Sequence, residues 1–152
     1  MNRKVPDNIS VLLVEDNEED AELTLRVFRQ YHLANHIHVV RDGAEALDCL
    51  FGNGADGHNA CEQTKLILLD LKLPKVDGLE VLRRCKTDER TKSIPVVMLT
   101  SSGEEQDVIK SYELGVNSYI VKPVDFHQFV EAVKQLNLYW MILNQRPEGS
   151  LV

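Results

Sequence analysis

Five polar residues follow directly on short apolar runs, and their side chains are of kinds that handle phosphate and metal ions. The first run is followed by Glu15 and Asp16, the third by Asp70, the fourth by Thr100 and the fifth by Lys122. If the chain brings these ends together, three carboxylates about 4 Å apart repel by roughly 4 kcal/mol per pair at an effective dielectric of 20. A divalent cation must then compensate them. Hard oxygen ligands favour Mg²⁺, with Mn²⁺ able to substitute.

The same residues suit phosphoryl transfer, in which charge on the transferred oxygens needs fixed positive partners and the nucleophile needs positioning. Asp70 is the best candidate nucleophile because it ends the third of five runs, with acids on one side and Lys122 on the other. Carboxylates that form aspartyl phosphates are an established kind of nucleophile. No His or Cys lies beside these positions in the sequence, so a zinc site is not expected.

The apolar runs predict the strands that position these residues. They are Val11–Val14, Ile37–Val40, Leu66–Leu69, Val96–Leu99 and Tyr119–Val121. At least three are continuous, without alternation, as in strands buried on both faces of a parallel sheet. Segments with helical spacing lie between them. The pattern predicts an α/β fold with a doubly wound, five-stranded parallel sheet, which binds ligands at the carboxyl ends of its strands.

Capping residues predict where two of the helices begin and where one ends. Asp42-x-x-Glu45 and Ser102-x-x-Glu105 have the pattern of capping boxes. Gly115 suits the left-handed residue that ends the helix after Ser102.

Length and composition limit the organisation of the chain. Its 152 residues fit one domain over 1–152, with a core from about 9 to 143 and poorly ordered tails. A net charge of -7 argues against binding nucleic acid. No apolar run approaches 18 residues, so we expect no membrane segment and a cytoplasmic protein. Cys49, Cys61 and Cys85 lack CxxC spacing and are predicted to be reduced.

The last predicted helix carries an apolar stripe that continues beyond the length needed to cover the sheet. The stripe comprises Phe126, Phe129, Val133, Leu136, Trp140 and Leu143. Its second half, with Tyr139 and Trp140, is either packed under the N-terminal tail or forms a dimer or partner surface. The sequence leaves both possibilities open.

The chain resembles the receiver domains of two-component response regulators from about Val11 to Tyr139. The matching motifs are VLLVEDN at 11–17, LILLDLKLPKVDG at 66–78, IPVVMLTSS at 94–102 and YIVKP at 119–123. The resemblance implies a flavodoxin-like receiver fold in which Asp70 accepts a phosphoryl group from a histidine kinase. It also implies that the protein is a switch and not an enzyme with an external substrate.

The resemblance further implies a metal site. Asp16 would bind Mg²⁺ directly, Glu15 through water, and the main-chain carbonyl of Lys72 would complete the protein ligands beside Asp70.

The resemblance also assigns roles to residues on the other side of the site. Thr100 would hydrogen-bond the phosphoryl oxygens and Lys122 would pair with them. The Lys122-Pro123 peptide bond is expected to be cis. Tyr119 would be the aromatic switch that turns inward when Thr100 moves.

A finer resemblance is to the small single-domain receivers that serve bacterial phytochrome kinases. It implies a sensor histidine kinase as partner, signalling by protein contact without a DNA-binding output domain, and a homodimer through the C-terminal helix. Two alternatives remain. One is a phosphate-independent binding module, and the other is an aspartyl-phosphatase hydrolase, which would need an Asp where Lys72 stands.

Overall fold

The computed structural model describes residues 11–30, 37–52, 64–123 and 125–135, over which five strands alternate with five helices. The strands are β1 (Val11–Val14), β2 (Ile37–Val40), β3 (Leu66–Leu69), β4 (Val96–Thr100) and β5 (Ser118–Val121). The helices are α1 (Glu18–Gln30), α2 (Gly43–Phe51), α3 (Gly78–Thr87), α4 (Glu105–Glu113) and α5 (Phe126–Gln135). The alternation predicted from the sequence is therefore confirmed.

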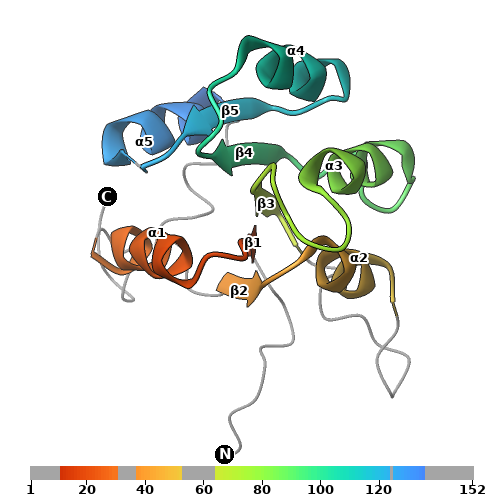
Figure 1. Ribbon diagram of the computed structural model, residues 1–152, viewed down its shortest axis with the longest axis horizontal. Helices are drawn as coiled ribbons and strands as arrows, with labels where there is room; N and C mark the ends of the chain where they lie inside the picture. Colours follow the sequence, from red (N-terminus) through yellow and green to blue (C-terminus); the bar gives the residue numbers. More distant parts are fainter. Residues whose placement is uncertain (1–10, 31–36, 53–63, 124, 136–152) are drawn as a thin grey trace, which may run out of the picture.

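All five strands are parallel and lie in the order β2-β1-β3-β4-β5. Figure 1 shows α1 and α5 on one face of the sheet and α2 and α3 on the other, with α4 beside β5. This is the doubly wound, flavodoxin-like arrangement expected from the sequence. The strand order reverses between β1 and β3, and ligands bind at such a reversal in open α/β sheets.

Burial explains why the central runs are continuously apolar. Every residue of β1, β3 and β4 is buried, whereas the edge strands β2 and β5 are mostly half-buried. Three predicted strands have the observed bounds. The other two are longer by one residue each, because Thr100 continues the pairing of β4 and Ser118 begins that of β5.

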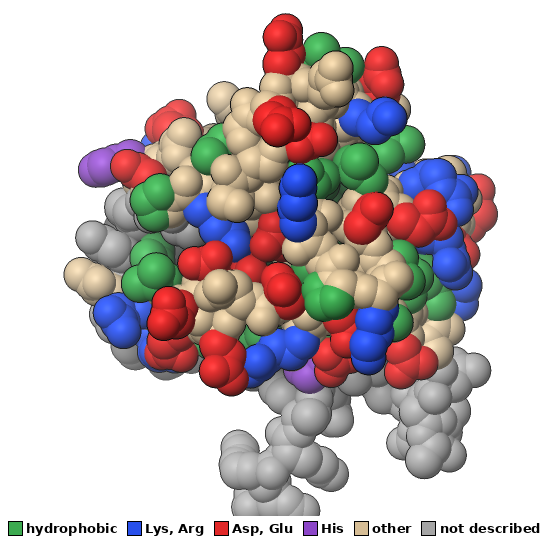
Figure 2. Space-filling model, in the orientation of Figure 1, with side chains coloured by type: hydrophobic (Ala, Val, Ile, Leu, Met, Phe, Trp, Pro, Cys, Tyr) green, Lys and Arg blue, Asp and Glu red, His purple; other side chains and the backbone are tan. Residues whose placement is uncertain are grey.

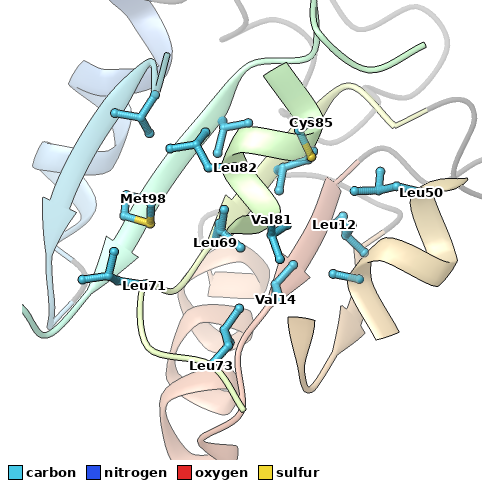
Figure 3. Close-up of a cluster of buried hydrophobic side chains, with 14 of the residues drawn as sticks. Leu12, Val14, Leu50, Leu69, Leu71, Leu73, Val81, Leu82, Cys85 and Met98 are labelled. Carbon is cyan, nitrogen blue, oxygen red and sulfur yellow. The ribbon is translucent and has the colours of Figure 1, made fainter. Parts of the chain in front are cut away.

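Two apolar clusters fill the space on either side of the sheet. Figure 3 shows one of them, in which Val81, Leu82 and Cys85 of α3 point toward strand residues such as Leu69 and Met98. In the other cluster, Phe28 of α1 and Phe129 of α5 lie with ring centroids 5.1 Å apart. Both helical layers are thereby fixed to the sheet that carries the polar residues.

The capping predictions have different outcomes. Asp42 caps α2 by accepting a hydrogen bond from the Glu45 amide at 2.7 Å, but the Glu45 carboxylate reaches the amide of Arg41 and not that of Asp42. The box at Ser102 is wrong. Helix α4 begins after Glu104 without a side-chain cap. Ser102 lies two residues too early to be the capping residue, and its hydroxyl donates to Asp107 at 2.5 Å and accepts from the Glu104 amide at 3.4 Å.

The end of α4 is as predicted. Gly115 has a φ of 102°, a left-handed conformation that glycine adopts without the steric cost of a Cβ atom. The cis peptide bond at Lys122-Pro123, which the family resemblance implied, is also present.

The cysteine prediction is correct for Cys85 and wrong for Cys49. Cys85 is a buried free thiol, and burial raises its pKa to about 11. Cys49 is disulfide-bonded. The absence of CxxC spacing excludes only a local pair, since a disulfide requires closeness in space and not in sequence.

Part of the predicted C-terminal stripe lies within the described residues. Phe129 is fully buried, as its place on the stripe predicts, whereas Tyr139, Trp140 and both predicted tails lie outside the described residues. Among the described helices, none has the length and apolar character that crossing a membrane would require.

The start of α3 is packed directly against the backbone that follows β3. A Cβ atom at Gly78 would lie 2.1 Å from the carbonyl oxygen of Asp70 and 2.7 Å from that of Leu71. The Gly78 amide also donates to the Leu71 carbonyl at 2.8 Å. The missing side chain therefore allows the helix to approach the strand end that carries Asp70.

Gly78→Ala is expected to destabilise the fold by about 3 kcal/mol, because the methyl group forces α3 away from this backbone. Urea unfolding followed by circular dichroism would measure the change. Gly103→Ala is a matched control, since its Cβ would meet only a Val121 methyl group at 3.7 Å. Equal midpoints for the two variants would contradict the close-approach argument.

Candidate functional site

Hydrogen bonds of the backbone hold the polar residues at the carboxyl ends of the strands. The Glu15 amide donates to the carbonyl of Val40, and the Asp70 amide donates to that of Val14 at 3.1 Å. The Lys122 amide donates to the Thr100 carbonyl at 2.8 Å. The extension of the strand pairing by one residue thus places each functional side chain next to the others.

Three of the predicted residues form a compact group of carboxylates. Glu15, Asp16 and Asp70 each offer one oxygen, and these atoms all lie within 4.8 Å of one another. Glu15 and Asp70 are buried, with exposed fractions of 1% and 7%, whereas Asp16 is exposed. Three carboxylate oxygens with one open side fit a hard divalent cation that keeps some of its water.

Lys122 provides the positive charge of the site. Its Nζ lies 2.5 Å from Glu15, 2.9 Å from Asp20 and 3.2 Å from Asp70, and its side chain is only 9% exposed. Paired carboxylates and an ammonium group with little access to water interact more strongly than exposed pairs do. In this structure Lys122 is therefore paired with carboxylates. Its pairing with phosphoryl oxygens, which the family resemblance implied, stays a prediction.

The environment shifts the pKa of both Glu15 and Lys122. Burial raises the pKa of Glu15 to about 7, against the opposing effect of its hydrogen bond to Lys122. Burial by itself lowers the pKa of Lys122. Hydrogen bonds to Asp20 and Glu15 and the charge of Asp70 outweigh it, so the pKa of Lys122 lies above the usual value for lysine.

Asp20 is the site residue that the sequence analysis missed. It lies in the first turn of α1 and reaches Lys122 from there. The sequence partly indicated that Asp20 lies near the site, because it comes four residues after Asp16 in a helix that starts at the same edge of the sheet. It was obscured by its neighbours Glu18 and Glu19, whose exposed carboxylates have the same appearance in the sequence.

Thr100 and Tyr119 are connected to each other through Ser102. Thr100 is fully buried, and its hydroxyl oxygen accepts a hydrogen bond from the Ser102 amide at 3.3 Å. Tyr119 is half-buried, and its hydroxyl donates to the Ser102 carbonyl at 2.7 Å. A movement of Ser102 would therefore affect both side chains.

An open cleft gives access to the acidic group. It has a volume of about 540 Å³. Its walls are formed by Asp16, Leu71, Lys72, Leu73, Pro74, Asp77, Leu79 and Asp107. The exposed Lys72 lies on this wall, and its amide points to Asp70 Oδ1 at 3.4 Å. Figure 2 shows acidic side chains gathered near the middle of this view of the surface, with lysine or arginine side chains beside them.

Comparison with known proteins agrees with the fold and the site. The family model described as "Response regulator receiver domain" matches residues 11–134. The chain therefore belongs to the receiver domains of response regulators, which are phosphoacceptor switches of two-component systems.

Individual relatives are similar over most of their length. The probable methanogenesis regulatory protein FilR2 of Methanothrix harundinacea is 40% identical, with 93% of this chain and 89% of that protein covered. Response regulator Rcp1 of Synechocystis sp. is 39% identical, with coverage of 86% and 88%.

Solved structures show the same similarity. The bacteriophytochrome response regulator RtBRR has a TM-score of 0.78 at 54% identity, with 93% of this chain and 86% of that one covered. The Mn(2+)-bound form of Rcp1 has a TM-score of 0.70 at 36% identity, with coverage of 97% and 99%.

Removal of the ammonium group tests the charge balance of the site in the absence of metal. Lys122→Met is expected to lower the free energy of unfolding by about 3 kcal/mol near neutral or higher pH, because it leaves buried carboxylates unpaired. A carboxyl group whose pKa is raised on folding stabilises the protein less as the pH rises from 4.5 to about 7. The loss should therefore be smaller at about pH 5.5 than at about pH 8, because Glu15 is then protonated.

Urea unfolding with EDTA at both pH values measures this difference. Lys92→Met is the control, because Lys92 forms an exposed pair with Glu89 and should show little effect at either pH. A loss for Lys122→Met that does not vary with pH would contradict the assigned charge balance.

Proposed function

We propose that Asp70 accepts a phosphoryl group from a sensor histidine kinase in a reaction that requires Mg²⁺. The observation that carries this proposal is the position of Asp70. Its carboxylate shares a cluster with Glu15 and Asp16 and lies 3.2 Å from the Lys122 ammonium. A nucleophile between a cation-binding group and a fixed positive charge is the arrangement that phosphoryl transfer needs.

The cation would be held by the carboxylates of Glu15, Asp16 and Asp70 and by the main-chain carbonyl of Lys72. All of these donors are oxygens, which suits Mg²⁺ and allows Mn²⁺ to substitute. The relative Rcp1, whose structure contains Mn²⁺, supports this assignment. When bound, the cation neutralises charge that develops on the phosphoryl oxygens.

Residues of this chain would carry out the transfer as follows. An oxygen of Asp70 attacks the phosphorus of a phosphohistidine, the P–N bond breaks, and its electron pair remains on the imidazole nitrogen. Lys122 donates a hydrogen bond to a phosphoryl oxygen, and the Thr100 hydroxyl donates to another. The cleft beside Asp16 and Lys72 leaves room for the incoming imidazole.

The change would reach the surface through Ser102. Once Thr100 turns toward the phosphoryl oxygens, the hydrogen bond between its hydroxyl oxygen and the Ser102 amide weakens. Ser102 also holds the Tyr119 hydroxyl and Asp107 of α4, so its displacement alters both. Tyr119 would act as the switch residue, and the surface formed by α4, β5 and α5 would change its affinity for a partner.

The kinase partner is proposed to be of the phytochrome type, and the protein to act in the cytoplasm, where such a kinase has ATP. The similarity to the bacteriophytochrome response regulator RtBRR supports this choice. A downstream protein would recognise the switched surface.

Incubation with acetyl phosphate and Mg²⁺ is expected to add the mass of one phosphoryl group to the intact protein. Excess EDTA or Asp70→Asn should abolish the adduct, because each removes a component of the transfer. An autophosphorylated phytochrome-type kinase should label the wild-type chain and leave Asp70→Asn unlabelled.

The outcome separates the proposed function from its main alternative. No adduct under any of these conditions, together with no response to beryllofluoride, would indicate a phosphate-independent binding module. An adduct that persists in Asp70→Asn would place the phosphoacceptor elsewhere.

We also propose that the chain forms one receiver domain whose core reaches about residue 143. This domain would form a homodimer through its C-terminal helix. The residues of the proposed interface, Tyr139 and Trp140, lie outside the described residues. Truncation before Tyr139 should abolish self-association without reducing phosphorylation, because the site residues all precede it. Analytical ultracentrifugation of both forms measures this. Equal sedimentation would place any interface elsewhere.

A further inference from the structure

Asp20 is an acidic side chain that the proposed reaction does not yet use. Its Oδ2 lies 2.9 Å from the Lys122 Nζ, and its side chain is 36% exposed. Asp20 lies in α1, whereas Glu15 and Asp70 follow strands β1 and β3. Lys122 is therefore held from a helix as well as from the sheet.

The three carboxylates around Lys122 differ in whether they also belong to the group that could hold a cation. An ammonium group has three N–H donors, and the distances to Glu15, Asp20 and Asp70 account for all of them. Glu15 and Asp70 also belong to the group whose oxygens lie within 4.8 Å of one another and could hold a cation. Asp20 is absent from that group. Its bond to Lys122 is thus the one that a bound cation does not compete for.

The carboxylate of Asp20 is not the group that caps α1; like the other two acidic residues of the first turn of the helix, it adds a negative charge there. The Asn17 side chain caps the helix by accepting from the Asp20 amide at 2.9 Å, and the Asp20 carbonyl accepts from the Thr24 hydroxyl at 3.1 Å. Both bonds use the backbone of Asp20 and are retained when its side chain is changed. The described contact of the carboxylate itself is with Lys122.

We propose that Asp20 is a positioning residue for phosphoryl transfer, holding the Lys122 ammonium beside Asp70 while the cation engages Glu15 and Asp70. This inference rests on the proposed function. With one N–H kept by Asp20, the other two are released by the carboxylates that turn to the cation. They then become available to phosphoryl oxygens. Without Asp20, Lys122 bonds only to groups that the cation also needs, so the ammonium and the cation oppose each other.

Asp20→Asn tests the inference because it preserves size and removes the charge. The affinity for Mn²⁺, measured by isothermal titration calorimetry, is expected to fall about fivefold, as for loss of a charged hydrogen bond. The maximal rate of phosphorylation by acetyl phosphate at saturating Mg²⁺ is expected to fall about tenfold, since Lys122 is then less often in place. Asp20→Glu, which keeps a carboxylate, should recover most of the rate.

Glu19→Gln is the matched control, since it removes the same charge from the same helical turn at an exposed position. It should change both quantities less than about twofold, because exposed charges are screened by solvent and salt. In a Lys122→Met background, Asp20→Asn should have no further effect on the rate, because its partner is gone. Urea unfolding confirms that each variant is folded.

The results distinguish two kinds of failure. If the wild-type chain takes no phosphoryl group, the proposed function fails. If it is phosphorylated and Asp20→Asn behaves as Glu19→Gln does, only the role of Asp20 is overturned. The role is also overturned if the Mn²⁺ affinity falls while the maximal rate is unchanged, because Asp20 would then act only through its charge on the cation.

Discussion

The carboxylates of Glu15 and Asp70 lie almost entirely out of water at the edge of the sheet, where unpaired charges raise the free energy of the folded state. Lys122 offsets this by donating to both and to Asp20. Burial raises the pKa of Glu15 to about 7 despite its hydrogen bond to Lys122, so this pairing does not fully offset the cost of removing the carboxylate from water. The excess of carboxylates and the one open side of the site favour the entry of a divalent cation. A phosphoryl group, which is itself anionic, would need the positive charges of that cation and of Lys122.

The parallel sheet explains how residues distant in sequence reach this balance. Adjacent strands end at the same edge, so the residue after each apolar run is brought beside the next one. Gly78 lets α3 approach the end of β3. On the other side, Ser102 joins Thr100 to Tyr119 and to Asp107 of α4. Hydrogen bonds therefore connect the end of β4 to β5 and α4.

The predictions that failed concern side chains whose partner in the folded chain is not set by the local sequence pattern. Ser102 has the pattern of a helix cap, but α4 begins two residues later, after Glu104, and the Ser102 hydroxyl donates to Asp107 within that helix. Cys49 has no nearby cysteine in sequence and is nevertheless disulfide-bonded. Asp20 resembles its exposed acidic neighbours, and only its distance to Lys122 distinguishes it. In each case the local sequence pattern indicates which partners a side chain could bond to, but not which of them it contacts in the folded chain.

The sequence alone determined the strands, their burial and the residues at their ends, because continuous apolar runs bury on both faces and the residues that follow them meet at one edge. It also identified Glu15, Asp16, Asp70 and Lys122 as one group. Tertiary structure decided how that group shares its charges. The partners of Lys122 depend on distances of a few ångströms between α1 and the strand ends, which residue spacing does not specify. Hydrogen bonds weaken steeply over such distances, so only the folded geometry selects among them.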